Sequence, residues 1–140
     1  MNRKSKIKNL WGELPVKDSI RTPYIILKEQ AFILNEATNQ LLIGHVEKIV
    51  LKRNPSYDFE CVLEIKAPSI NNYSISVVEI KYPITIYPLI ISSQVAEDSY
   101  QECRNETELN QILEKILSSS EVKRVVLGLL SEVRADKVRE

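Results

Sequence analysis

DFECVLEIKA, residues 58–67, is the stretch that indicates the fold most clearly. Every second position carries an apolar or small side chain: Phe59, Cys61, Leu63, Ile65 and Ala67. Charged side chains fill most of the positions between them. Because successive side chains of a β-strand point to opposite faces, the pattern predicts a strand with one face in the core and the other in water.

The segments on either side of this strand predict an antiparallel meander. Residues 41–52 are rich in β-branched residues, and Asn54-Pro55-Ser56 has the chemistry of a turn. Such a short connection favours a hairpin. In a third strand, residues 73–82, the apolar positions change parity at Val77-Val78. One extra residue there keeps both apolar sets on the inner face, so we expect a β-bulge.

The segment that follows, YPITIYPLIISSQVA at residues 82–96, contains no charged residue in a protein that is 27% charged. Pro83 and Pro88 each remove a ladder donor, so we interpret the segment as a sheet edge. Natural edges usually carry charge, which suggests that something covers this one. We expect Ile84–Ile91 to be a bent continuation of the third strand, because no two-residue hairpin turn follows Tyr82. A separate fourth strand is the alternative.

Helices are predicted at both ends of the sheet. Thr22-Pro23 is a helix start, and the helix that follows, residues 24–40, should be largely buried because it is apolar over a wide face. Asn105 and Glu108 have the spacing of a capping box before a helical stripe of apolar residues. Ser118-Ser119-Ser120 ends that helix and caps another, and both helices should cover the inner face of the sheet.

These elements predict an α+β fold. We expect an N-terminal helix, an antiparallel meander of three or four strands with a bent edge strand, and two C-terminal helices packed on the sheet. The predicted domain spans residues 22–134. A basic arm and lead-in, residues 1–21, precede it, and a charged tail, residues 135–140, follows it.

Composition excludes several classes of function. Nineteen basic and nineteen acidic residues cancel, so no whole-molecule field attracts nucleic acid or an anionic membrane. Neither an export signal nor an apolar stretch of about 20 residues is visible, and we expect a cytoplasmic protein with no membrane partner. The two cysteines, Cys61 and Cys103, are interpreted as reduced structural thiols.

Catalytic and ligand-binding signals are weak. His45 is the only histidine, and the three glycines are isolated, so neither a zinc site nor a phosphate-binding loop is indicated. We therefore expect no metal, no cofactor and no catalytic residues. A small hydrolase or transferase built around Cys103 or His45 remains a third hypothesis, because nucleophile pairs meet in space rather than in sequence.

The leading hypothesis is a non-enzymatic protein-binding module, such as a bacterial adaptor, antitoxin, immunity protein or assembly subunit. Its partner, a different protein or a second copy, would add a strand along the apolar edge. The residues expected to bind that partner are Ile84, Ile86, Tyr87, Leu89 and Ile91.

A nucleic-acid-binding accessory protein is the alternative. The basic arm combines phosphate attraction with an aromatic ring that can stack on a base. Its residues are Arg3, Lys4, Lys6, Lys8 and Trp11. A solubilising terminus with Trp11 packed into the domain explains the same residues without a ligand. An acidic stretch between Glu97 and Glu108 also suits a basic partner, or the arm of a second copy.

Overall fold

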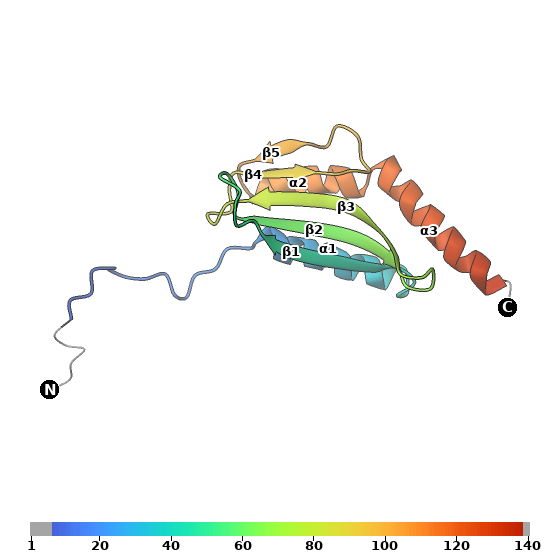
Figure 1. The fold of residues 1–140 in the computed structure, drawn as a ribbon, viewed down its shortest axis with the longest axis horizontal. Coiled ribbons are helices and arrows are strands. Elements are labelled where there is room, and N and C mark those ends of the chain that lie inside the picture. The colour runs from blue at the N-terminus through green and yellow to red at the C-terminus, as the bar shows by residue number, and fades with distance from the viewer. Residues whose placement is uncertain (1–6, 139–140) are drawn as a thin grey trace.

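The computed structural model describes residues 7–138, which form three helices and five strands. In chain order these are α1 (Pro23–Ala37), β1 (Ile43–Val50), β2 (Phe59–Ala67), β3 (Tyr73–Tyr82), β4 (Leu89–Ser92), β5 (Gln101–Cys103), α2 (Glu106–Leu117) and α3 (Ser120–Val138). Residues 7–20 contain neither helix nor strand and extend away from the folded body (Figure 1).

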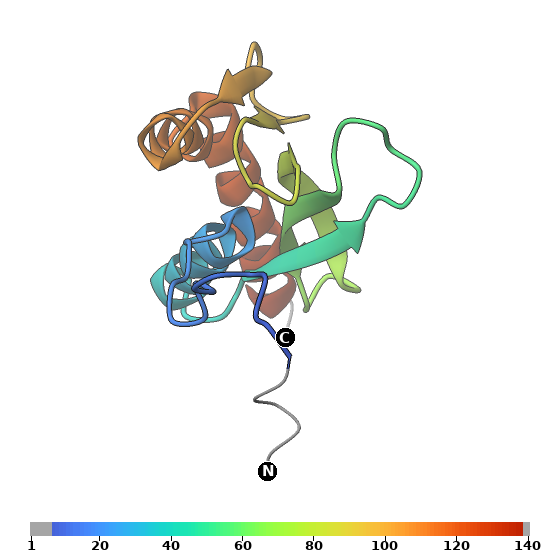
Figure 2. The same ribbon diagram turned by 90° about the vertical axis from the view of Figure 1, so that its left-hand side faces the viewer.

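All five strands form one antiparallel sheet, and their order in space is their order in the chain. The described helices lie on one face of this sheet and leave the other face open (Figures 1 and 2). The α+β class, the N-terminal helix and the two C-terminal helices are therefore confirmed. The sheet has one strand more than the three or four expected, because β5 has only three residues and no recognisable pattern.

The inner face of the sheet is the main wall of the core. In β2 the alternation is as predicted, with Cys61, Leu63, Ile65 and Ala67 buried and the residues between them half-buried. Leu63 pairs with Val78 but Glu64 pairs with Ser76, which leaves Val77 as an extra residue on β3. Both valines of the predicted bulge are fully buried, so the bulge is confirmed.

Helix α1 begins where the Thr22-Pro23 signal places it. The Thr22 hydroxyl accepts a hydrogen bond from the Ile25 N–H at 3.3 Å, and Pro23 occupies the first helical position. The helix packs on β1, and it lies so close to Gly44 that an added Cβ would be 2.6 Å from Ala31. Glycine at this position therefore sets the distance between helix and strand.

The prediction that the first helix is largely buried is wrong. Ile25, Phe32 and Ile33 are exposed, although Ile26 and Leu27 are buried. Adjacent residues of a helix lie about 100° apart, so a helix resting on a sheet buries only one stripe. The apolar residues of α1 surround the helix, and those on its outer side remain in water.

The charge-free segment is divided between a loop and a separate strand. Residues 83–88 connect β3 to β4, so the alternative of a fourth strand is correct and the bent continuation is not formed. Both prolines lie in this connection and take no donor from the sheet. Beyond β4, Leu89 pairs with Cys103 of β5.

The two C-terminal helices are capped as predicted. The Asn105 side chain accepts from the Glu108 N–H at 2.9 Å, while the Glu108 carboxylate accepts from the Arg104 N–H at 2.8 Å. The Ser119 hydroxyl accepts from the Val122 N–H at the start of α3. α3 continues to Val138, beyond residue 134, where the domain was expected to end.

Candidate protein-binding edge

The residues expected to form the binding edge do not share one surface. Leu89 and Ile91 are fully buried and Ile86 nearly so, whereas Tyr87 is half-buried and Ile84 is exposed. β4 lies between β3 and β5, and is therefore an inner strand. Its apolar side chains pack in the core, which explains why the segment carries no charge.

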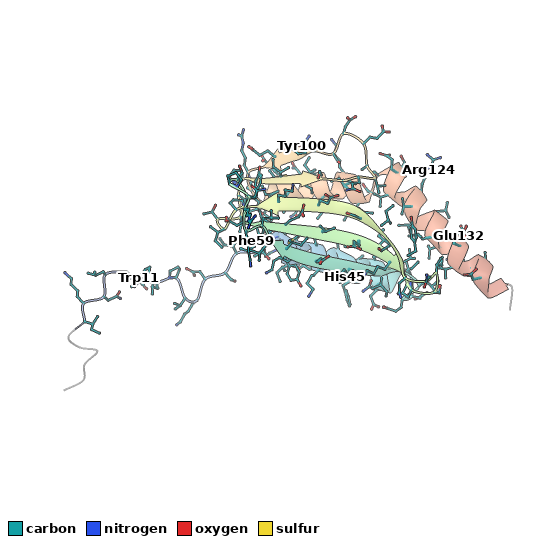
Figure 3. All side chains as sticks on the ribbon, in the orientation of Figure 1. Trp11, His45, Phe59, Tyr100, Arg124 and Glu132 are labelled. Atoms are coloured by element: carbon teal, nitrogen blue, oxygen red, sulfur yellow. The ribbon has the colours of Figure 1, made fainter. Side chains whose placement is uncertain are left out.

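The basic arm is only partly described. Arg3, Lys4 and Lys6 lie outside the described residues, while Lys8 and Trp11 are exposed. Trp11 is 78% exposed and lies far from the sheet (Figure 3). The alternative in which this tryptophan packs into the domain is therefore not what the structure shows.

The candidate nucleophiles do not meet. Cys61 and Cys103 point into the core, whereas His45 lies on the open face, opposite Glu64. Burial raises the pKa of both thiols, that of Cys103 to about 11, and the carboxylates of Glu108 and Glu102 contribute to the Cys103 shift. Both side chains are therefore protonated thiols at neutral pH. Within residues 7–138 no cluster of three or more His, Cys, Asp or Glu is suited to a metal ion.

The long free edge of the sheet is β1. Two hydrogen bonds show which of its residues face that edge. The N–H of Leu51, an odd-numbered residue, donates to the backbone carbonyl of Asp58, next to β2. The N–H of Gly44, an even-numbered residue, donates instead to the Asn35 side chain of α1 at 2.7 Å. The direction of the backbone N–H and C=O groups alternates along a strand. Those of the even-numbered residues of β1 therefore point away from β2.

The backbone groups that face the open side are those of Val46, Lys48 and Val50. Among residues 7–138 no other strand pairs with β1 on this side. Asn35 caps only the first position, at Gly44. Three consecutive edge-facing residues, each with a donor and an acceptor, therefore remain open for a strand from elsewhere.

An apolar flank borders this edge. We use the term for the exposed side chains of Ile25, Phe32 and Val50. Phe32, which is 63% exposed, lies four residues beyond Lys28 and three before Asn35, so helical geometry places it on the same side of α1 as both. Asn35 contacts the edge directly, which puts Phe32 beside it.

Tyr24 connects the start of α1 to β1. The ammonium groups of Lys28 and Lys48 lie 4.9 and 5.0 Å from its ring centroid. Contacts of this kind are worth about 0.5–1 kcal/mol each at exposed sites. The Lys48 contact links α1 to the part of β1 that carries the open backbone groups, whereas the Lys28 contact lies within α1 itself.

Arg21 fixes the point at which the arm leaves the domain. Its guanidinium donates two hydrogen bonds to the Glu29 carboxylate, at 2.7 and 2.8 Å, and lies 3.4 Å from Glu106 of α2. The hydrogen bonds and charge of Arg21 lower the pKa of Glu29, and Glu29 raises that of Arg21. The arm therefore starts from a defined position at the beginning of α1.

The flank was missed because sequence reasoning treated every apolar residue of α1 as core. Two adjacent pairs, Ile25-Ile26 and Phe32-Ile33, were the signal that could have revealed it. Neighbouring helix residues point about 100° apart, so the apolar residues of α1 together surround the helix and cannot all face the sheet. The free edge itself left no such signal, since strand order is not readable from the pattern of β1.

No helix within residues 7–138 is long and apolar enough to cross a membrane. Comparison with known protein families, characterised proteins and solved structures finds no match to this chain.

Proposed function

We propose that this chain is a non-enzymatic protein-binding module that accepts an extended segment of a partner along the free edge of β1. The observation that carries the proposal is the row of open backbone groups at Val46, Lys48 and Val50, bordered by the apolar flank. Strand addition of this kind obtains affinity from main-chain hydrogen bonds and specificity from neighbouring side chains.

The two sides of the added strand would meet different chemistry. One side faces the flank on α1, where Phe32 favours an apolar side chain. The other side lies next to the outward-pointing residues of β1, which include His45 and Glu47. The module therefore favours a partner strand that alternates apolar and polar residues.

Adaptor, antitoxin, immunity and assembly roles all fit a module of this kind, and the cytoplasm remains the proposed compartment. Support for a reducing compartment comes from Cys61 and Cys103, which are both free thiols.

Proline substitution at position 48 tests this function. The Lys48 N–H faces the open edge, so Lys48→Pro removes a donor from the binding site and none from the sheet. We expect the variant to fold and to lose the partner that a tagged wild-type chain retains from a host extract. Retention of that partner by Lys48→Pro contradicts the proposal.

Two controls accompany this variant. Lys48→Ala loses the same ammonium group but keeps the N–H, so it should retain the partner. Glu47→Pro removes an N–H that faces β2, and it should destabilise the whole domain. If Glu47→Pro folded as well as Lys48→Pro, the assignment of the open side of β1 would be wrong.

Nucleic-acid binding by the arm is the second candidate, and the exposure of Trp11 and Lys8 favours it. The open face of the sheet does not, because acidic side chains outnumber basic ones on it. These side chains are Glu47, Glu60, Glu64, Glu79 and Glu102 against Lys66 and Lys81. Binding through the arm would weaken steeply with salt and disappear on deletion of residues 1–10.

A further inference from the structure

The N-terminal arm, residues 7–20, exposes large apolar side chains that nothing in the described chain covers. They are Ile7, Leu10, Trp11, Leu14, Val16 and Ile20. Exposed apolar side chains that gather in one segment mark a site of interaction with another surface. The arm thus has the composition of a segment that is buried against another surface.

The arm is long enough to cover the apolar flank. Fourteen residues of extended chain span up to about 46 Å, at roughly 3.3 Å per residue. The fifteen residues of α1 extend for only about 22 Å. An arm that reaches a second α1 therefore covers the whole distance from Ile25 to Phe32.

The arm of the same chain reaches the free edge directly only by an unfavourable route. The start of α1 lies at the end of β1, because Lys48 contacts Tyr24, and the two elements run in opposite directions (Figure 1). A strand formed by the arm beside β1 would then run parallel to β1, with α1 as the crossover. Seen with the helices behind the sheet, as in Figure 1, this crossover would be left-handed. About 98% of such connections are right-handed.

We propose that two copies of this chain exchange their arms, so that the arm of each copy covers the free β1 edge and the apolar flank of the other. The inference rests on the proposed strand acceptor and names its partner as a second copy. Reciprocal exchange gives a closed two-fold dimer in which the same surfaces are used twice. Because Arg21 anchors each arm at Glu29, the arm departs from its own domain at a fixed point and bridges to the other.

Interface area agrees with this arrangement. Twelve large apolar side chains, at roughly 100 Å² each, bury on the order of 1,200 Å² from the arms alone. Stable complexes bury about 1,200–2,000 Å² in total.

Measurement of the mass of the full-length chain in solution tests the exchange. We expect a dimer at micromolar concentration. The dissociation constant of the Leu10→Ser, Trp11→Ser double variant should be at least about 30-fold higher than that of the wild type. Phe32→Ser should weaken the dimer as well. Ile84→Ser is the matched control, because it removes an equally exposed apolar side chain from a loop outside the proposed interface and should leave the dimer intact. A monomeric wild-type chain, or a dimer insensitive to the arm substitutions, overturns arm exchange.

Cross-linking distinguishes exchange from an arm that folds back on its own domain. A Trp11→Cys chain is mixed with a Phe32→Cys chain under oxidising conditions, and a disulfide-linked mixed dimer is expected. Ile84→Cys replaces Phe32→Cys in the control mixture and should give none. A third variant carries both Trp11→Cys and Phe32→Cys. If its disulfide forms only within one chain and never between two chains, the inference is overturned. The strand-acceptor function is judged separately, by partner loss in Lys48→Pro.

Discussion

Two single residues, Gly44 and Cys103, have surroundings that predict effects on stability. Gly44 lets α1 approach β1 so closely that a Cβ would collide with Ala31. The Cys103 thiol is fully buried beside the start of α2, where burial raises its pKa to about 11. Each of these features makes a stability prediction that does not depend on the function.

Gly44→Ala should destabilise the domain by about 1–3 kcal/mol, because the added methyl group lies 2.6 Å from the backbone and side chain of Ala31. Gly128→Ala is the matched control. It lies on the exposed side of α3 with no atom within 4 Å, and it should stabilise the helix by about 0.5–1 kcal/mol. Urea denaturation measures both changes. If both substitutions changed the free energy of unfolding in the same direction, the packing described at β1 would be contradicted.

The stability of the domain should fall between about pH 9 and pH 11. The pKa of Cys103 rises from 9.0 in the unfolded chain to about 11 in the folded one. Above pH 9 the unfolded chain loses this proton while the folded chain keeps it, so deprotonation favours unfolding. The full contribution of the Cys103 thiol to the free energy of unfolding is present below pH 9 and is lost as the pH rises through 11.

Cys103→Ala removes this titration. Its free energy of unfolding at pH 8 should be lower than that of the wild type, because a buried side chain is shortened. Between pH 8 and pH 10.5, however, the free energy of unfolding should fall by about 2 kcal/mol less in the variant than in the wild type. Denaturant titrations at the two pH values measure the difference. An identical loss in both proteins would mean that Cys103 does not carry the effect.

At the scale of elements, local signals are the ones that agree with the structure. The cap at Thr22, the cap at Asn105 and the bulge at Val77 all depend on residues that lie within a few positions of one another. Strand pairing beyond Tyr82 depends on distant contacts and was misread. The prolines of the charge-free segment looked like features of an edge strand because their loop could not be recognised.

Asn105→Ala should lower stability by about 1 kcal/mol, because the Glu108 N–H loses its acceptor at the start of α2. Asn110→Ala is the control: Asn110 is exposed in the interior of the same helix, where alanine is the better helix former. It should be neutral or slightly stabilising. Thermal unfolding distinguishes the two variants, and an equal loss in both would argue against the cap.

At the scale of the whole molecule, the chain divides into a packed domain and an exposed arm. The core extends from α1 through the inner face of the sheet to α2 and α3, with Leu27, Ile80 and Leu109 fully buried at its centre. Residues 7–20 contribute no buried side chain to it. The free edge and the flank lie on the domain, whereas the segment proposed to cover them lies outside it.

Deletion of residues 1–20 should leave the domain folded, because Arg21 and the Thr22 cap are retained and the core loses nothing. We expect an unchanged far-UV circular dichroism spectrum. The melting temperature of the truncated chain should also be independent of protein concentration, since no arm remains to link two copies. Loss of the fold on truncation would show that the arm contributes to the core.

The fold class was predictable from the sequence, whereas the candidate site was not. Alternation in residues 58–67 and the helix caps determine which elements form, since these depend on local backbone geometry. The site depends on which strand keeps an unpaired side. Because β5 pairs with β4, the charge-free segment is not such an edge, and β1 is the long strand left with one side unpaired within residues 7–138. A three-residue strand carries too little pattern to be recognised before its partner is known.

The sequence by itself determined the order and type of the main elements, because periodicity and capping act over a few residues. Only the tertiary structure decided which apolar residues are buried. Leu89 and Phe32 are both large and apolar, yet one is fully enclosed between β3, β5 and α2 and the other faces water. Burial depends on what lies against a side chain after the chain has folded, and that neighbour is distant in sequence.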